Sequence, residues 1–287
     1  MIFRTLTGIA LALGLSAGAQ AAPALWKVSD DDSAIYLFGS VHMLRADQEW
    51  RTPLLNKVVS KAERVYFETD ISPVGQAEAA SLSILHGFNT DGRLLNDIIS
   101  PELMAQLREA AEAHYVPMAS LLAMKPWMAA TTISSMPMIN AGYAANFGVE
   151  TVLSAELAEE RIGMLETVEE QMGFLAGGTE AEGIEMLQAS LDTLETVTAD
   201  VEDLTRSWAN GNPEELGALF MDQMGSFDSI MVERLIDNRN KNWTDQIADM
   251  LERNEGALLV VGAAHLAGEM SVVKLLEDKG FTSERIQ

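Results

Sequence analysis

The 287-residue chain has no cysteine, only four histidines, and 19 lysine and arginine residues against 43 aspartate and glutamate residues. Without cysteine it cannot form a disulfide, use a thiol as a nucleophile or carry a lipid on a cysteine. Its formal net charge of −24 repels phosphate backbones, so we expect no nucleic-acid partner. The same surface attracts cationic peptides or divalent metals, and it also keeps a protein soluble.

Long apolar runs are also absent, and the longest near the N-terminus belongs to an export signal. Arg4 precedes the apolar run Ile9–Leu15, and Ala19-Gln20-Ala21 has the small-x-small pattern of a signal-peptidase site. We therefore expect residues 1–21 to be a signal peptide and residues 22–287 to form a periplasmic or secreted protein. No later segment reaches the roughly 18 apolar residues of a spanning helix, so we expect no membrane span in the mature chain.

Short apolar runs alternate with helical patterns. Ala34–Phe38 and Arg64–Glu68 are separated by the helical spacing of Thr52–Lys61, and similar short runs recur at Arg161–Glu166 and Ala257–Val261. A strand–helix–strand order is typical of a parallel α/β unit. The sequence therefore predicts an α/β protein with a central, mostly parallel sheet.

The two ends of the chain repeat the same pair of motifs. Each half has an apolar run ending in Gly-x-x-His, at Gly39–His42 and Gly262–His265, and a run ending in Glu-Thr, at Glu68-Thr69 and Glu166-Thr167. This echo predicts a sheet made of two pseudo-repeated halves. The segment of about 169–255 is acidic and helical in pattern, and we expect it to be an all-helical cap inserted into the α/β core.

The paired Gly-x-x-His motifs indicate a functional site. The carboxyl ends of parallel strands border the crevice in which α/β folds bind ligands, and an imidazole there can bind a metal or move a proton. One such motif is usually structural, but two in the same phase predict that His42 and His265 share a site. His86 is expected in a loop and His114 at a helix end, both structural or exposed.

Two histidines cannot close a metal site, because catalytic zinc normally has three protein ligands. Glu68 and Asp70 would share one face of an extended chain, and Glu166 has the matching place in the second half. A mixed His and carboxylate set suits zinc, manganese, cobalt or iron(II). The alternative for each carboxylate is a helix cap or a solvated strand end. Arg239 is either in an ordinary helix ion pair or in contact with a substrate carboxylate or oxyanion.

A series of motifs resembles the TraB/GumN family in order and spacing over nearly the whole mature chain. They are Phe38-Gly39-Ser40-Val41-His42, Phe67-Glu68-Thr69-Asp70, Lys125-Pro126-Trp127, Gly142-Tyr143, Phe147-Gly148-Val149-Glu150, Leu165-Glu166-Thr167, Glu169-Glu170-Gln171, Arg239-Asn240 and Val261-Gly262-Ala263-Ala264-His265-Leu266. One departure is Glu150, where the family often has aspartate, so Glu150 is not counted among the expected site residues.

The family is similar to the Tiki metalloproteases and, more distantly, to ChaN-like haem-binding and erythromycin-esterase-like proteins. In Tiki-type members, the two Gly-x-x-His histidines and an acidic residue are taken as the metal-dependent active site. This resemblance implies the corresponding roles for His42, His265 and Glu68.

The expected function is therefore a metal-dependent hydrolase, with a periplasmic peptidase using a metal-bound water as the leading hypothesis. The expected residues are His42, His265, Glu68 and Glu166 as metal ligands, Glu68 and Arg239 as catalytic groups, and Asn240, Trp127 and Tyr143 as substrate contacts. One alternative is a non-catalytic protein that holds haem, a metal or a small ligand. The other is a metal-free esterase in which His42, His265 and Glu68 act as acid and base. The peptide or small-molecule substrate and the oligomeric state are left open.

Overall fold

The computed structural model describes residues 21–225 and 229–287. The predicted signal peptide lies outside these residues except for Ala21. The six strands of the described part are β1 (Leu25–Ser29), β2 (Ala34–Ser40), β3 (Arg64–Phe67), β4 (Ile162–Met164), β5 (Ala257–Gly262) and β6 (Thr282–Arg285).

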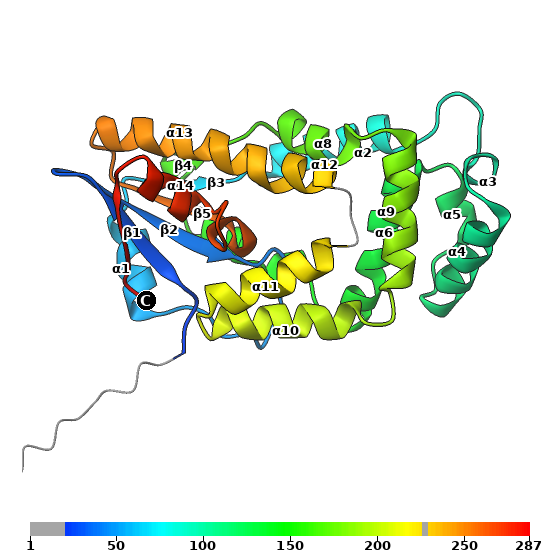
Figure 1. The fold of residues 1–287 in the computed structure, drawn as a ribbon, viewed down its shortest axis with the longest axis horizontal. Coiled ribbons are helices and arrows are strands. Elements are labelled where there is room, and N and C mark those ends of the chain that lie inside the picture. Colours follow the sequence, from blue (N-terminus) through cyan, green and yellow to red (C-terminus); the bar gives the residue numbers. More distant parts are fainter. Residues whose placement is uncertain (1–20, 226–228) are drawn as a thin grey trace, which may run out of the picture.

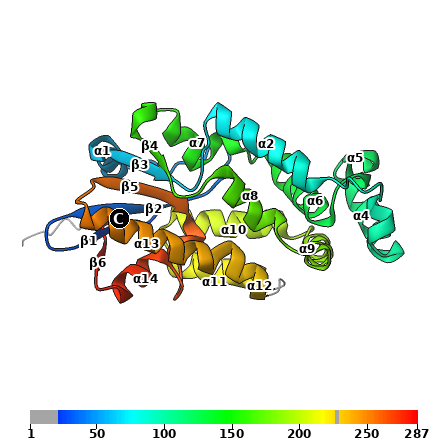
Figure 2. The same ribbon diagram turned by 90° about the horizontal axis from the view of Figure 1, so that it is seen from above.

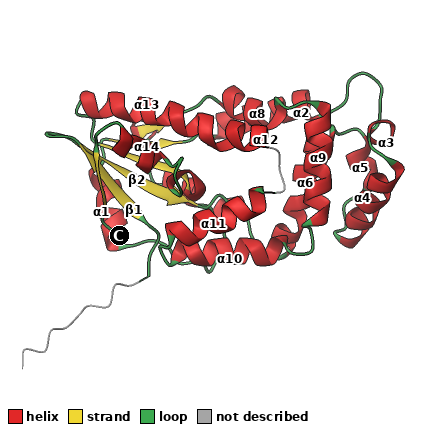
Figure 3. Cartoon of the chain, in the orientation of Figure 1, coloured by secondary structure: helices red, strands yellow, loops and turns green. Residues whose placement is uncertain are grey.

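Helices make up most of the remaining described chain (Figure 3). The α-helices are α1 (Pro53–Lys61), α2 (Pro73–Gly87), α3 (Leu95–Ile98), α4 (Pro101–Ala113), α5 (Met118–Leu122), α6 (Pro126–Asn140), α7 (Val149–Ser154), α8 (Val168–Ala176), α9 (Glu180–Asp192), α10 (Val197–Ala209), α11 (Pro213–Met224), α12 (Ser229–Val232), α13 (Asn238–Glu252) and α14 (Val272–Asp278). Short turns of other helical types are η1 (Ala145–Phe147), η2 (Glu159–Arg161), the π-helical η3 (Glu233–Asp237) and η4 (Ala263–Leu266).

The strands form one sheet in the order β4-β3-β5-β2-β1-β6. The pairs β4/β3, β3/β5 and β5/β2 are parallel, whereas β1 is antiparallel to β2 and to β6. The prediction of a mostly parallel α/β sheet is confirmed. The two strands that carry Gly-x-x-His, β2 and β5, are direct neighbours, and the register pairs Ser40 with Gly262. Both motifs therefore leave the sheet at the same rim.

Helices cover both faces of this sheet (Figures 1 and 2). α13 and α14 bury one face against alternate residues such as Leu37 and Leu259, and α1 and α7 bury the other against Phe38 and Val260. Because β5 is buried on both faces, all six of its residues are apolar or glycine and none is exposed. α1 begins as expected, with Thr52 accepting a hydrogen bond from the Leu55 N–H.

The helices away from the sheet have a hydrophobic core of their own. Side chains of α3 to α6 and α9 form it, with Leu107, Ile133 and Leu187 fully buried. The acidic segment expected as a cap contains α8 to α13. Its α9 packs on α6, and its α13 packs on the sheet (Figures 1 and 2). In the described part of the chain no helix combines the length and the apolar character needed to cross a membrane.

The structure corrects the placement of one histidine. His86 was expected in a loop but lies in the last turn of α2, a helix that begins after Ser72 with Pro73 at its first position. Ser72 accepts a hydrogen bond from the Gly75 N–H, which is an ordinary N-terminal cap. His114 lies at the C-terminal cap of α4, as expected.

Candidate active site

The carboxyl ends of the parallel strands bring the predicted residues together. His42 follows β2, Glu68 follows β3, Glu166 follows β4, and His265 lies in η4 directly after β5. Their meeting point is Gly262: a Cβ atom placed there would lie 3.2 Å from Glu68 Oε1, 3.4 Å from His265 Cδ2 and 3.5 Å from His42 Nε2. A methyl group at this position would enter the centre of the site and crowd the Glu68 carboxylate.

His42 is held by a carboxylate that the sequence did not assign to the site. Its Nδ1 lies 2.6 Å from Glu150 Oε1, and the same oxygen accepts a hydrogen bond from the Ser40 hydroxyl. The Glu150 carboxylate raises the pKa of His42 above its ordinary value of 6.5, and His42 in turn helps to lower the pKa of Glu150 despite its burial. The ring donates from Nδ1, so its Nε2 faces the centre of the site. The His42 side chain remains 63% exposed.

Gly148 allows Glu150 to reach His42. A Cβ atom at Gly148 would lie 2.1 Å from the His42 carbonyl oxygen, so any side chain would separate α7 from the end of β2. The neighbouring Val149 N–H donates to the Val41 carbonyl at 3.2 Å and fixes this approach. The Gly148-Val149-Glu150 sequence was therefore the available signal for the missed carboxylate.

His265 has a different environment, because it is buried and paired with an amide. The Asn240 side-chain amide donates to the Met270 carbonyl at 2.7 Å, so its Oδ1 is the atom 2.6 Å from His265 Nδ1. His265 must then carry its proton on Nδ1 and accept on Nε2. Burial lowers the pKa of His265 to about 3, and the nearby Arg239 acts in the same direction, so the ring is neutral at pH 7. Trp243 packs against it at 4.5 Å between ring centroids.

Arg239 lies at the centre of a buried ion network. Its Nε and Nη2 donate to Glu166, Nη2 also donates to Glu68 at 2.7 Å, and Nη1 faces the Leu235 carbonyl and His265 Nε2. A guanidinium has five N–H donors, and these contacts use all of them. Arg239 was expected to stabilise an oxyanion, but in this arrangement it has no donor left for a substrate. It instead fixes the position of Glu68.

The pKa values of the two carboxylates on Arg239 are shifted in opposite directions. Burial alone would raise the pKa of Glu68, but the cationic His42 and Arg239 and the Gly262 N–H lower it below its ordinary value of 4.5. Burial dominates at Glu166 and raises its pKa, although Arg239 opposes this effect. Glu68 is therefore a firm hydrogen-bond acceptor at neutral pH.

An open pocket of about 480 Å³ borders one side of this centre. His42, Glu68 and Glu150 line it, together with polar side chains from α2, α8 and η1. His265 and Glu166 lie behind these residues and do not contribute to the lining. The pocket has the size range of ligand-binding sites in proteins.

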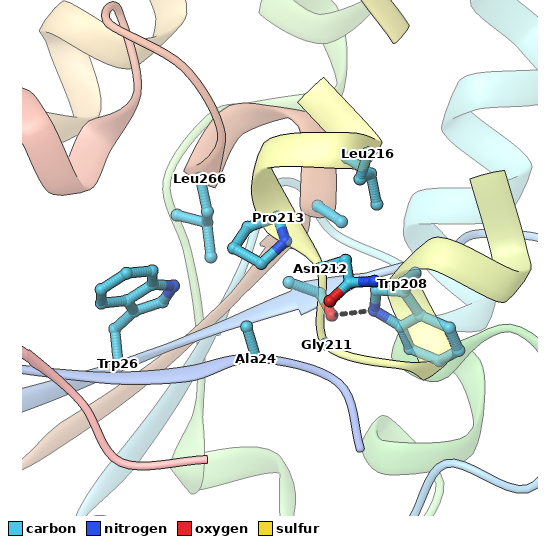
Figure 4. Close-up of a pocket in the computed structure, with 10 residues that line it drawn as sticks. Ala24, Trp26, Trp208, Gly211, Asn212, Pro213, Leu216 and Leu266 are labelled. Carbon is cyan, nitrogen blue, oxygen red and sulfur yellow. Dashed lines mark hydrogen bonds between the residues drawn. The ribbon is translucent and has the colours of Figure 1, made fainter. Parts of the chain in front are cut away.

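A second contact attaches the helical part to the Gly39–His42 motif. The Trp208 indole at the end of α10 donates to the Gly39 carbonyl at 2.7 Å, beside Pro213 and Leu216 at the start of α11 (Figure 4). The turn between α10 and α11 thus packs on the end of β2.

Three other residues named from the sequence lie elsewhere. Trp127, at the start of α6, lines a pocket between α6 and α9, and Tyr143 is buried near Arg45. Asp70 does not share a face with Glu68, because the chain bends after β3 and the Asp70 carboxylate accepts from the Ser72 N–H. The substrate-contact roles of Trp127 and Tyr143 stay predictions.

The comparison with known proteins gives a family assignment. The model of the TraB/PrgY/gumN family matches residues 24–285, which include every residue of the site. The chain belongs to the TraB/PrgY/gumN family. It is also 32% identical over 77 residues to a protein described as a metalloprotease TIKI homolog from Amphimedon queenslandica. That match covers 25% of this chain and 15% of the TIKI homolog, and no solved structure matches significantly.

The four predicted metal ligands already have other partners in this TraB/PrgY/gumN site. Glu68 and Glu166 share the guanidinium of Arg239, and the acceptor nitrogen of His265 faces the same guanidinium at 3.3 Å. In residues 21–225 and 229–287, no three His, Asp or Glu side chains are grouped to hold a metal ion. As the side chains lie, the four predicted ligands do not fit one coordination shell.

Proposed function

We propose that this protein is a hydrolase of peptide or ester bonds in which His42 is the general base that activates water. One observation carries the proposal: His42 is oriented by Glu150 while its Nε2 faces Glu68 at the edge of an open pocket. An imidazole held on one nitrogen by a carboxylate, with the other nitrogen free, is the arrangement of a base in acyl transfer. The family membership and the match to a TIKI homolog support a hydrolase.

In the proposed reaction, His42 accepts the proton of the water molecule and Glu68 orients that water. A water molecule in the pocket would donate one hydrogen bond to His42 Nε2 and one to the Glu68 carboxylate, which directs an oxygen lone pair toward the substrate carbonyl. His42 takes the proton as the oxygen attacks, and Glu150 stabilises the imidazolium. The same proton then passes to the leaving amine or alkoxide. Water splits the acyl bond into a carboxylic acid and an amine or alcohol, with no other co-reactant.

Arg239 and His265 position Glu68 and contact no substrate. The guanidinium holds the Glu68 side chain from behind, and the neutral His265 accepts from that guanidinium without adding charge. Asn240 fixes the tautomer of His265 through its hydrogen bond to Nδ1. Through these contacts, the buried Arg239, His265 and Asn240 keep Glu68 ionised beside His42.

Metal dependence and export to the periplasm belong to the proposal as separate questions. His42 and Glu68 are the two predicted ligands that line the pocket, fewer than the three protein ligands usual for catalytic zinc. The TIKI homolog is the reason to test a metal, and the predicted signal peptide is the reason to look for the protein outside the cytoplasm.

The test is hydrolysis of a quenched fluorescent peptide library and of p-nitrophenyl esters by purified protein. Wild type is compared with His42→Ala, Glu150→Gln and the control His114→Ala, after dialysis against EDTA and with manganese, cobalt or zinc returned. We expect His42→Ala and Glu150→Gln to lose about 10²- to 10⁴-fold in rate, the range for a general base. His114→Ala should match wild type, because His114 lies on α4 away from the pocket.

Each outcome has one reading. Wild-type rates in the His42→Ala protein would refute the proposal. Activity that survives EDTA identifies a metal-free enzyme, and activity restored only by an added ion identifies metal dependence.

A further inference from the structure

The wall of the His42 and Glu68 pocket includes a side-chain amide beside the Glu68 carboxylate. Gln171 lies near the start of α8 and lines the same pocket of about 480 Å³ as His42 and Glu68. Its Nε2 contacts Glu68 Oε2 at 3.4 Å. The amide therefore lies next to the group that orients the attacking water in the proposed reaction.

The start of α8 fixes the position of Gln171. Thr167 caps the helix by accepting from the Glu170 N–H, and the Glu170 carboxylate accepts from the Thr167 N–H in return. Val168 lies three residues before Gln171 and is buried, and helical spacing places both on one side of α8. The helix thus holds the Gln171 side chain at the pocket wall.

Glu68 has two hydrogen bonds that are shorter than the one from Gln171. Its Oε1 accepts from the Gly262 N–H and its Oε2 from Arg239 Nη2, both at 2.7 Å. An N–H···O bond normally measures about 2.9–3.0 Å, so the 3.4 Å contact of Gln171 is weak. Because Glu68 keeps both short bonds without it, the Gln171 amide can exchange Glu68 for another acceptor at little cost.

The proposed reaction needs a donor for the charge that forms on the substrate carbonyl oxygen. As water attacks, this oxygen becomes an oxyanion, and N–H groups aimed at it stabilise the transition state. Arg239 has no donor left for this role. A carboxamide has two N–H donors, and in residues 21–225 and 229–287 Gln171 makes no side-chain hydrogen bond other than the one to Glu68.

The other two amides at the pocket wall are less suitable. The Gln76 side chain donates to the Ile71 carbonyl at 2.9 Å, and Asn146 is an exposed residue of η1. Among the described residues, neither amide has a hydrogen bond to His42 or Glu68.

We propose that Gln171 is a catalytic residue that donates a hydrogen bond to the oxyanion of the substrate carbonyl, a proposal that rests on the hydrolase function above. The amide leaves Glu68 as the tetrahedral intermediate forms, and its N–H binds the oxygen that carries the charge. This contact transfers no proton and forms no covalent bond. It lowers the energy of the transition state more than that of the bound substrate, because the carbonyl oxygen is charged only in the former.

The test compares wild type with Gln171→Met on the best substrate found among the peptides and esters. Methionine keeps the length of the side chain and removes both N–H donors. We expect kcat to fall by about 10²- to 10³-fold, the loss found on removal of one oxyanion donor, with KM changed little. The control Gln106→Met should match wild type, because Gln106 is an exposed residue of α4 outside the pocket.

Two readouts separate a contact with substrate from a role in positioning Glu68. A phosphonate analogue of the substrate carries a charged oxygen on a tetrahedral centre, and its affinity should fall in Gln171→Met in parallel with kcat/KM. The pH midpoint of the rate should stay the same, because the substitution removes no charge beside His42. Unchanged phosphonate affinity, or a shifted pH midpoint with kcat restored at the new optimum, would overturn the assignment.

Failure of this role and failure of the hydrolase function give different results. If wild type hydrolyses neither peptides nor esters, or if His42→Ala keeps its rate, the hydrolase function fails and the role of Gln171 falls with it. If His42→Ala is inactive while Gln171→Met has wild-type kcat and phosphonate affinity, the hydrolase stands and Gln171 is not its oxyanion donor.

Discussion

Removal of Arg239 should strongly destabilise the fold, because it leaves two buried carboxylates without their shared cation. The side chains of Arg239, Glu68 and Glu166 are 9%, 7% and 1% exposed. Breaking a buried ion pair by removing one partner costs about 3–5 kcal/mol, since the remaining charge is both desolvated and unpaired. We expect Arg239→Met, which keeps much of the side-chain volume, to lose about this much stability at pH 7.

The chain provides a matched control in Arg93. It also binds two carboxylates, those of Asp91 and Glu180, but its side chain is 47% exposed and water solvates all three groups. Arg93→Met should therefore change stability little, as is usual for surface ion pairs. Urea unfolding followed by far-UV circular dichroism measures both variants. With an m value of about 3 kcal/mol/M, the Arg239→Met midpoint should fall by about 1–1.7 M.

The stability loss in Arg239→Met should depend on pH, and this dependence tests whether the two unpaired carboxylates cause the loss. In wild type the pKa of Glu68 is lowered, so its contribution is present at neutral pH and is lost as the pH falls toward 2. Without Arg239 the pKa values of Glu68 and Glu166 rise in the folded state. The variant then takes up protons on folding and gains stability as the pH falls, so the gap to wild type should narrow between pH 7 and 5. Equal losses in Arg239→Met and Arg93→Met, or a gap independent of pH, would refute the reasoning.

Three further outcomes follow from the site and the sequence. Gly148→Ala should separate α7 from the end of β2, so hydrolysis should fall while circular dichroism keeps its helical spectrum; an unaffected rate would show that Glu150 reaches His42 in another way. Because Glu150 raises the pKa of His42, the rate should increase with pH through an apparent pKa above 6.5, and Glu150→Gln should move that midpoint to lower pH; identical pH profiles would contradict this. Mass spectrometry of protein from a periplasmic extract should give an N-terminus at Ala22, and an intact Met1 would contradict the predicted signal.

The core strands could be predicted because burial fixes their composition. β2 and β5 are buried by helices on both faces, and such strands appear as continuous apolar runs. β6 was missed for the opposite reason, whereas β1 was missed although its Leu25 and Val28 are buried. β6 (Thr282–Arg285) is a polar edge strand with no buried residue, so its pairing with β1 leaves no hydrophobic pattern to recognise.

The site could be predicted only in part, because local motifs are visible in the sequence and contacts between distant residues are not. Each Gly-x-x-His motif is local, so its place at a strand end could be predicted from a few consecutive residues. The Glu150 contact joins residues 108 positions apart, and it depends on how closely α7 packs against β2. The Arg239 network likewise joins α13 to the ends of β3 and β4. No periodicity records such contacts, so the sequence left Glu150 out of the site and did not identify the carboxylates that bind Arg239.

The two Gly-x-x-His halves resemble one another in sequence but differ in chemistry. His42 is exposed, bound to a carboxylate and lines a pocket, whereas His265 is buried, bound to an amide and faces a guanidinium. A carboxylate partner makes an imidazole a stronger base, and burial beside a cation makes it a weaker one. The rim of the sheet thus presents one histidine whose pKa is raised to about 9 and one whose ring remains neutral at pH 7. In the proposed mechanism only the first transfers a proton, and the second accepts a hydrogen bond from Arg239, which in turn donates to Glu68.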